Sequence, residues 1–150
     1  MKHLLLGDEA IAQGAIDAGL SGVYAYPGTP STEITEYIQL SEKRKALSAG
    51  LENGADSAYS LEVKGKIFCQ WATNEKTAME GALGMSYMGK RALVCMKHVG
   101  MNVCADAFMN AAITGVNGGL VVVAADDPSM HSSQNEPDSR LYATFPMIPW

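Results

Sequence analysis

The sequence predicts a doubly wound α/β fold, in which a mostly parallel β-sheet carries helices on both faces. Two observations support this fold class: short apolar segments recur along the chain, and segments with helical periodicity lie between them. Each apolar segment is too short for a buried helix, and none alternates apolar with polar residues. We therefore expect strands that are covered on both faces. The segments are residues 23–26, 67–71, 92–96 and 120–125.

The first two predicted helices follow from signals at their N-termini. Asp8 is a capping side chain before a helix over residues 9–18, which Gly19 ends. Thr29 supplies the capping hydroxyl of the second helix, and Pro30 suits its first position. With the strands between them, these helices give the order of elements that a parallel sheet requires.

The third predicted helix begins at Asn74 and Glu75 and reaches Gly89. It is rich in small residues, and each glycine inside a helix costs about 0.5–1 kcal/mol relative to alanine. Close approach of another helix or of a ligand would offset that cost. The small residues are Thr77, Ala78, Gly81, Ala82, Gly84 and Ser86.

The C-terminal part of the chain contains one further helix and two irregular stretches. The helix starts at Asn102 or Ala105 and ends at Gly115. Residues 126–138 and the tail from position 145 are rich in polar residues or proline and fit no regular element. We interpret residues 1–150 as a single domain, the N-terminal fragment of a longer subunit.

Composition narrows the classes of function. The chain has 150 residues, of which 47% are hydrophobic and 18% charged, as in a globular domain with its own core. Its net charge is −5 and its basic residues are scattered, which argues against a nucleic-acid partner. The longest apolar run, residues 120–125, is far below the roughly 20 residues of a bilayer helix. We expect a cytoplasmic protein with no membrane partner.

The three cysteines argue against a metal site or an iron–sulfur cluster in this chain. Cys69, Cys95 and Cys104 form no CxxC pair and lie in apolar surroundings, as buried free thiols do. The acidic residues and the histidine of residues 126–138 have no recognised metal-ligand spacing, so a solvated loop is the better interpretation. We predict no metal ligands.

Candidate binding residues follow the apolar segments, because ligands of open α/β sheets bind outside the carboxyl ends of the strands. These places are residues 26–31, 72–76, 97–100 and 126–131. No GxGxxG fingerprint and no GxxxxGK[ST] phosphate loop occurs there, which argues against NAD, FAD and ATP.

Glu75 has two interpretations. A carboxylate in the first turn of a helix interacts favourably with the helix dipole and needs no further role. At a strand exit, however, it could also hydrogen-bond a flat heterocycle in an apolar pocket, where desolvation raises the pKa of a carboxyl group.

Similar alternatives exist for the other polar residues at strand ends. Thr29 is either only a helix cap or, beside Gly28, part of a place where a ligand approaches the backbone. Lys97 and His98 are either a surface pair or groups that hold a substrate carboxylate.

Five motifs taken together resemble a known family. They are GDEAIA (7–12), YPGTPSTE (26–33), NEKTAME (74–80), MKHVGMN (96–102) and DDPSMHSSQNE (126–136). In this order they resemble the N-terminal region of the alpha subunit of the indolepyruvate:ferredoxin oxidoreductases, which are 2-oxoacid:ferredoxin oxidoreductases. The resemblance covers essentially the whole chain.

The resemblance implies a thiamine-diphosphate enzyme in which this chain is the pyrimidine-binding domain, with a six-stranded parallel sheet. Glu75 matches the family glutamate that hydrogen-bonds the aminopyrimidine ring, and Thr29 matches a threonine near the substrate carbonyl. The implied cofactor-binding residues are Gly28, Thr29, Asn74 and Glu75. The implied substrate residues are Thr29, Lys97 and His98.

The resemblance also implies a reaction and partners. The whole enzyme oxidatively decarboxylates arylpyruvates, with indole-3-pyruvate as the first candidate, to acyl-coenzyme A and passes electrons through [4Fe–4S] clusters to ferredoxin. The family's magnesium and diphosphate site uses GDG followed by asparagines, whereas only Gly7-Asp8-Glu9 occurs here. The Mg²⁺ site and the clusters are therefore expected in the rest of the alpha subunit or in a beta subunit, and the fragment alone is expected to be inactive.

Two alternatives remain. The chain could be a noncatalytic subunit-pairing domain of the same fold, although pairing alone would not require Glu75. It could also belong to another thiamine-dependent 2-oxoacid decarboxylase, which a cysteine motif elsewhere in the gene product would distinguish. The ferredoxin oxidoreductase and the other thiamine-dependent decarboxylase both imply dimerisation. We expect the small-residue face of helix 75–89 at the interface.

Overall fold

A parallel sheet forms the centre of the molecule, a computed structural model that describes residues 4–48 and 65–144. The described strands lie in the order β2-β1-β3-β4, and each neighbouring pair is parallel. The predicted strands are confirmed, with their ends shifted by no more than one residue. The resemblance implies six strands, and the described residues form four. The strands are β1 (Gly22–Ala25), β2 (Phe68–Trp71), β3 (Ala92–Lys97) and β4 (Leu120–Ala125).

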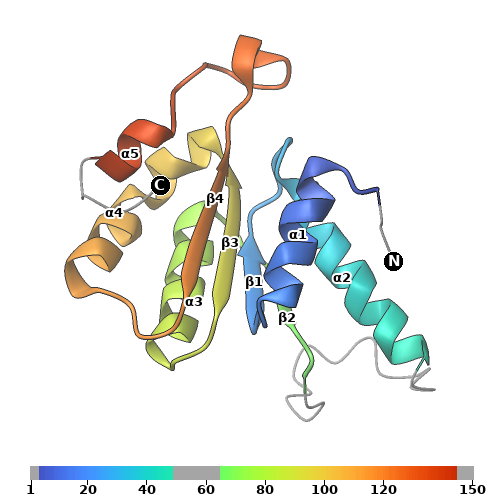
Figure 1. Ribbon diagram of the computed structural model, residues 1–150. Helices are drawn as coiled ribbons and strands as arrows, with labels where there is room; N and C mark the ends of the chain where they lie inside the picture. Colours follow the sequence, from blue (N-terminus) through green and yellow to red (C-terminus); the bar gives the residue numbers. More distant parts are fainter. Residues whose placement is uncertain (1–3, 49–64, 145–150) are drawn as a thin grey trace.

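Helices cover both faces of the sheet, which confirms the doubly wound prediction (Figure 1). The core on one face contains Val23, Ile34 and Ile38, all fully buried. The core on the other contains Met79 and Val94. The first face carries α1 (Gly7–Asp17) and α2 (Thr32–Ser48), and the second carries α3 (Glu75–Tyr87) and α4 (His98–Thr114).

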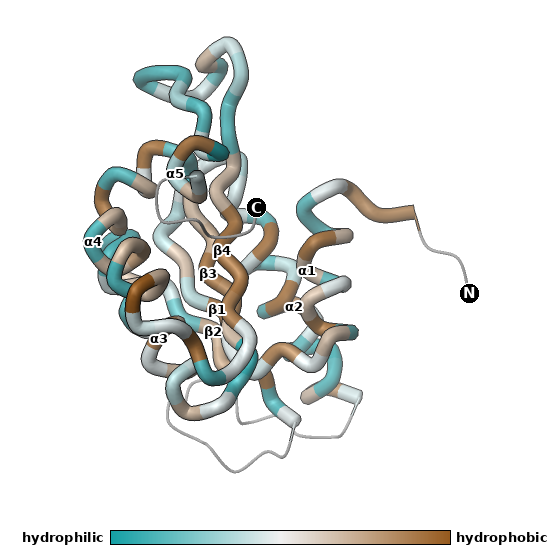
Figure 2. Tube along the Cα trace, turned by 60° about the vertical axis from the view of Figure 1, so that its left-hand side comes forward, coloured by the Kyte–Doolittle hydropathy of each residue, from teal (hydrophilic) through white to brown (hydrophobic). Residues whose placement is uncertain are grey.

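The segment after β4 is mainly irregular, as predicted. It projects beyond the sheet and is mostly hydrophilic (Figure 2), and it contains one 3-10 turn, η1 (Pro128–Met130). A short helix, α5 (Arg140–Thr144), follows, which the sequence did not indicate. The predicted irregular tail from position 145 lies outside the described residues. None of the described helices is long and apolar enough to cross a membrane.

The starts of α1 and α2 differ from the predictions. Helix α1 has Leu6 and not Asp8 as its N-cap residue, and the Leu6 amide donates to Glu9 Oε2 at 2.9 Å. The prediction that Thr29 caps α2 with Pro30 at its first position is wrong. The Thr29–Pro30 peptide bond is cis and α2 begins only at Thr32, whose hydroxyl accepts from the Gly28 amide at 2.9 Å. A turn closed by side-chain hydroxyls therefore takes the place of the expected first helical turn.

The start of α3 is as predicted, but that of α4 is not. Asn74 caps α3, and its Oδ1 accepts from the Thr77 amide at 2.9 Å. Helix α4 begins at His98, immediately after β3, and not at Asn102 or Ala105. No side-chain cap is present there, so no capping residue marks this start in the sequence.

The small residues of α3 pack inside the domain. Ala78 and Ala82 are fully buried, and a Cβ atom added to Gly81 would lie 2.7 Å from Cε1 of Tyr24 on β1. The Ser86 hydroxyl donates to the Gly118 carbonyl at 2.6 Å. Close approach to α3 is thus confirmed, but the expected place of Ala78 and Gly81 at a subunit interface is wrong, because this domain's own sheet occupies that face.

Candidate functional site

The carboxyl ends of β1 and β3 lie where the path of the chain across the sheet reverses. From β1 the chain passes through α2 to β2 on one side, and from β3 through α4 to β4 on the other. Helices α2 and α4 cover opposite faces, so the segments leaving β1 and β3 diverge at this edge (Figure 1). Ligands of open α/β sheets bind at such a reversal point.

The segment after β1 packs against the end of β3. A Cβ atom added to Gly28 would lie 3.3 Å from Cβ of Lys97, so the backbone at Gly28 contacts the lysine stem. The Ser31 hydroxyl donates to the Gly28 carbonyl at 2.8 Å and closes the turn. Thr29, at the tip of this turn, is exposed. The structure therefore brings Gly28, Thr29 and Lys97 together at the reversal point.

Glu75 lies in the first turn of α3 with its side chain turned into the domain. It is only 8% exposed. It contacts the first turn of α4, since a Cβ atom added to Gly100 would lie 2.5 Å from Glu75 Cγ and 2.8 Å from Glu75 Oε1. Among the described residues, no hydrogen bond or ion pair reaches this carboxyl group. Packing alone holds it, at a place where two helix N-termini converge.

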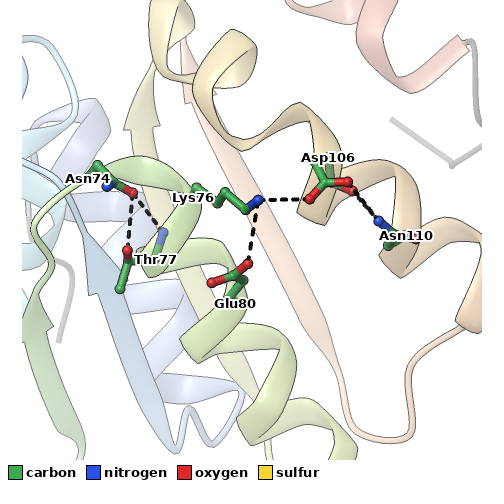
Figure 3. Close-up of polar contacts among 6 residues, drawn as sticks. All are labelled: Asn74, Lys76, Thr77, Glu80, Asp106 and Asn110. Atoms are coloured by element: carbon green, nitrogen blue, oxygen red, sulfur yellow. Dashed lines mark hydrogen bonds and ion pairs between the residues drawn. The ribbon is translucent and has the colours of Figure 1, made fainter.

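The next residue, Lys76, points the other way. Its Nζ lies 2.9 Å from Asp106 Oδ2 of α4 and 4.0 Å from Glu80 Oε1, at the surface between the two helices (Figure 3). The hydrogen bond with Lys76 lowers the pKa of Asp106. This exposed pair ties α3 to α4 close to the buried carboxyl group.

Cys104, one turn further along α4 from Gly100, is buried beside the same carboxyl group. Burial, and then the negative charge of Glu75, raise the pKa of the Cys104 thiol to about 12. Burial raises the pKa of Cys95 to about 12 as well. Thiols with such pKa values stay protonated at neutral pH and are poor nucleophiles. Glu75 is therefore the candidate reactive group here, and the thiols of Cys95 and Cys104 have a structural role.

Lys97 and His98 join the end of β3 to the loop after β4. Lys97 Nζ donates to the Ser132 carbonyl, and His98 Nε2 lies 3.0 Å from the Asn135 carbonyl oxygen. A carbonyl only accepts, so His98 Nε2 is the donor in this hydrogen bond. His98 is fully buried and its Nδ1 has no partner among the described residues. Both side chains of this pair therefore contact a backbone at the same edge of the sheet.

The loop after β4 is held by its own hydrogen bonds. Asp127 Oδ2 accepts from the Ser133 hydroxyl at 2.6 Å and from the Ser132 amide at 2.8 Å, and these bonds lower the pKa of Asp127. Glu136 Oε1 accepts from the Ser129 amide at 3.0 Å. In residues 4–48 and 65–144, no three His, Cys, Asp or Glu side chains are grouped so that they could hold a metal ion. These loop carboxylates have structural partners.

Gly100 is the site residue whose role the sequence did not indicate. It lies within the third strand-end segment, 97–100, but its contact with Glu75 joins two helices. The sequence contains no signal for this role, because the helix was predicted to start only at Asn102 or Ala105, after Gly100.

Comparison with known proteins identifies relatives of this chain. No family model matches the chain. Over 148 residues, 99% of this chain, it is 45% identical to the indolepyruvate oxidoreductase subunit IorA of Pyrococcus horikoshii, 46% to that of Archaeoglobus fulgidus and 43% to that of Methanothermobacter marburgensis. The chain resembles part of IorA. It spans about a fifth of the length of these IorA relatives, and the resemblance inferred from its motifs is confirmed.

A solved structure supports the fold. The chain matches a 2-oxoglutarate:ferredoxin oxidoreductase from Magnetococcus marinus, which has 2-oxoglutarate, coenzyme A and succinyl-CoA bound, with a TM-score of 0.60 and 24% identity. The match covers 83% of this chain and 18% of the other. At this identity the likeness shows the fold alone, which is shared with part of that 2-oxoglutarate:ferredoxin oxidoreductase.

Proposed function

We propose that this chain is the pyrimidine-binding part of a thiamine-diphosphate-dependent oxidoreductase. The whole enzyme oxidatively decarboxylates arylpyruvates, indole-3-pyruvate first among them, to acyl-coenzyme A and passes the electrons to ferredoxin. The similarity to IorA over 99% of the chain supports the class of enzyme. The rest of the subunit, a second subunit and ferredoxin are the partners that this function requires.

The observation that carries the proposal is Glu75, whose side chain is 8% exposed at this edge of the sheet and whose carboxyl group has no hydrogen-bond partner among the described residues. A carboxyl group that no group of its own chain engages is available to form a hydrogen bond with a ligand. A ring nitrogen of an aminopyrimidine suits this carboxyl group. When bound, thiamine diphosphate supplies an electron sink for the carbanion that decarboxylation produces.

Three residues form the side of the proposed site that faces the cofactor: Glu75, Asn74 and Gly28. Glu75 exchanges a proton with the ring nitrogen. Asn74 fixes the first turn of α3, and with it the position of Glu75, through its cap on the Thr77 amide. Gly28, which lacks a side chain, lets the stem of Lys97 pack against the backbone after β1. These residues form the cofactor side of the proposed site.

The substrate side consists of groups at the ends of β1 and β3. Thr29 offers an exposed hydroxyl group. Lys97 supplies a positive charge for a 2-oxoacid carboxylate, and His98 has an imidazole nitrogen, Nδ1, that no described residue uses. We assign the Mg²⁺ and diphosphate site and the [4Fe–4S] clusters to the rest of the enzyme.

A direct test is an anaerobic assay of the complete enzyme with thiamine diphosphate, Mg²⁺, coenzyme A and a viologen dye. We expect dye reduction with indole-3-pyruvate, weaker reduction with phenylpyruvate and least with pyruvate. The isolated 150-residue chain should reduce no dye. The absence of reduction with every acid, in a preparation shown to contain clusters and cofactor, would contradict the proposed function.

A further inference from the structure

We propose that Gly100 is a positioning residue that sets the place of the Glu75 carboxyl group. This inference rests on the proposed function of Glu75. Gly100 lies in the first turn of α4 and contributes no side chain of its own. Its part is to leave free the volume that the Glu75 side chain occupies.

The geometry of the contact leaves no room for any side chain at position 100. An added Cβ atom would lie 2.5 Å from Glu75 Cγ, 2.8 Å from Oε1 and 2.9 Å from Cδ. All of these distances are shorter than carbon and oxygen atoms tolerate without a bond. A substitution must therefore move the carboxyl group or separate α3 from α4.

The packing around the contact limits how the carboxyl group can move. Gly100 itself is buried, and so are Ala78, Met101 and Cys104 on the two helices. Close-packed interiors accommodate an extra methyl group only by shifting their neighbours. All three contacting atoms belong to the flexible Glu75 side chain and none to the backbone, so this side chain is the group that moves.

The backbone at Gly100 does not itself require glycine. Unlike Gly89 or Gly115, it has no positive φ angle and lies inside a regular helix. Alanine is favoured there by about 0.5–1 kcal/mol on helix propensity alone. The contact with Glu75 is the feature of this position that excludes alanine.

Gly14 provides a matched control. It also lies inside a helix, α1, and a Cβ atom added there would meet nothing within 4 Å. Gly14→Ala and Gly100→Ala thus make the same chemical change, and only the second creates a contact with Glu75.

The test is a double-mutant cycle in the complete enzyme with Gly100→Ala, Glu75→Ala and the double variant. Two quantities are measured without substrate: the thermal midpoint of the cofactor-free protein, and the rate of deuterium exchange at C2 of bound thiamine diphosphate. We expect Gly100→Ala to slow exchange about 10-fold to 100-fold, as small misplacements of catalytic groups do. Gly14→Ala should leave the exchange rate unchanged.

The double variant separates positioning from a general structural role. Glu75→Ala removes the atoms in contact, so adding Gly100→Ala to it should neither slow exchange further nor lower the midpoint. If Gly100→Ala alone fails to fold, recovery of folding in the double variant supports the proposal. Equal losses in both backgrounds, or a double variant that also fails to fold, would overturn it.

The two proposals can fail separately. If Glu75→Ala leaves C2 exchange unchanged, the proposed function of Glu75 is wrong. If Glu75→Ala slows exchange but Gly100→Ala behaves like Gly14→Ala, only the positioning role of Gly100 is wrong.

Discussion

Glu75 and Asp127 both lie shortly after a strand, yet their carboxyl groups are held differently. Glu75 is 8% exposed, packed between the first turns of α3 and α4, and has no hydrogen-bond partner among the described residues. Asp127 accepts hydrogen bonds from the amide of Ser132 and the hydroxyl of Ser133 within its own loop. A carboxyl group that its own chain satisfies is structural, whereas one that packing positions without a partner is available to a ligand.

The largest expected effect separates function from stability at Glu75. In the complete enzyme, Glu75→Gln keeps the size of the side chain but cannot share a proton with a ring nitrogen. We expect turnover to fall by about 100-fold or more, the usual contribution of a general acid–base group. Dye reduction measures the loss, and the thermal midpoint should stay close to that of the parent. Turnover within about a factor of two of the parent would remove Glu75 from the mechanism.

The second prediction concerns the packing of α3 against the sheet, on the side of the domain that holds Glu75. Gly81→Trp places an indole ring where the Tyr24 ring lies, with a first clash at 2.7 Å. We expect about 3 kcal/mol of destabilisation or loss of the fold, because overpacked cores cannot relax fully. Cooperative thermal unfolding measures it, with Gly84→Trp as the control, since Gly84 has nothing within 4 Å. A Gly81→Trp protein that folds normally but loses its partner subunit would restore the interface hypothesis.

The smallest expected effect concerns Asp127 in the loop after β4. Hydrogen bonds from Ser133 and Ser132 lower the pKa of Asp127 below 3.8. Because this pKa is lower in the folded loop than in the unfolded chain, the carboxylate stabilises the folded loop at a pH above its unfolded pKa. That contribution is lost as the pH falls through the folded pKa. We therefore expect Asp127→Asn to reduce protection of the Ser132 amide from hydrogen exchange near neutral pH, and the difference from the parent to disappear in acid.

Asp106→Asn is the control for the loop, because Asp106 is an exposed carboxylate on α4, bonded to Lys76 and not to the loop. It should leave Ser132 protection unchanged after correction for intrinsic exchange rates. A pH-independent difference between Asp127→Asn and the parent would show that the charge of Asp127 does not hold the loop.

The sequence predicted features that local signals encode. The strands were recognised because continuous apolar segments such as residues 92–96 have no other stable environment in a chain of this composition. The start of α3 was recognised because Asn74 caps it. The beginning of α4 was missed for the complementary reason: the helix follows β3 directly, with no side-chain cap to mark it.

Features that depend on contacts between distant residues were beyond the sequence. The glycines of α3 indicated a close approach, but not that Tyr24 of the same domain makes it. The start of α2 was missed for a local reason: hydroxyl groups three and four residues after Gly28 bond to its backbone, and these bonds compete with a capping role for Thr29. The contact of Glu75 with Gly100 joins two helices, so neither local segment contains evidence of it.

Helix α4 follows β3 directly, so the number of residues at this junction is fixed. Lys97 is the last residue of the strand and His98 is the first of the helix. A helix turns by about 100° per residue, so one inserted residue would rotate the first turn of α4 by that angle. The insertion would break both the contact of the His98 imidazole with the Asn135 carbonyl and the contact of Gly100 with Glu75. Insertions and deletions are thus excluded at this junction, whereas the projecting loop after β4 can vary in length at its tip.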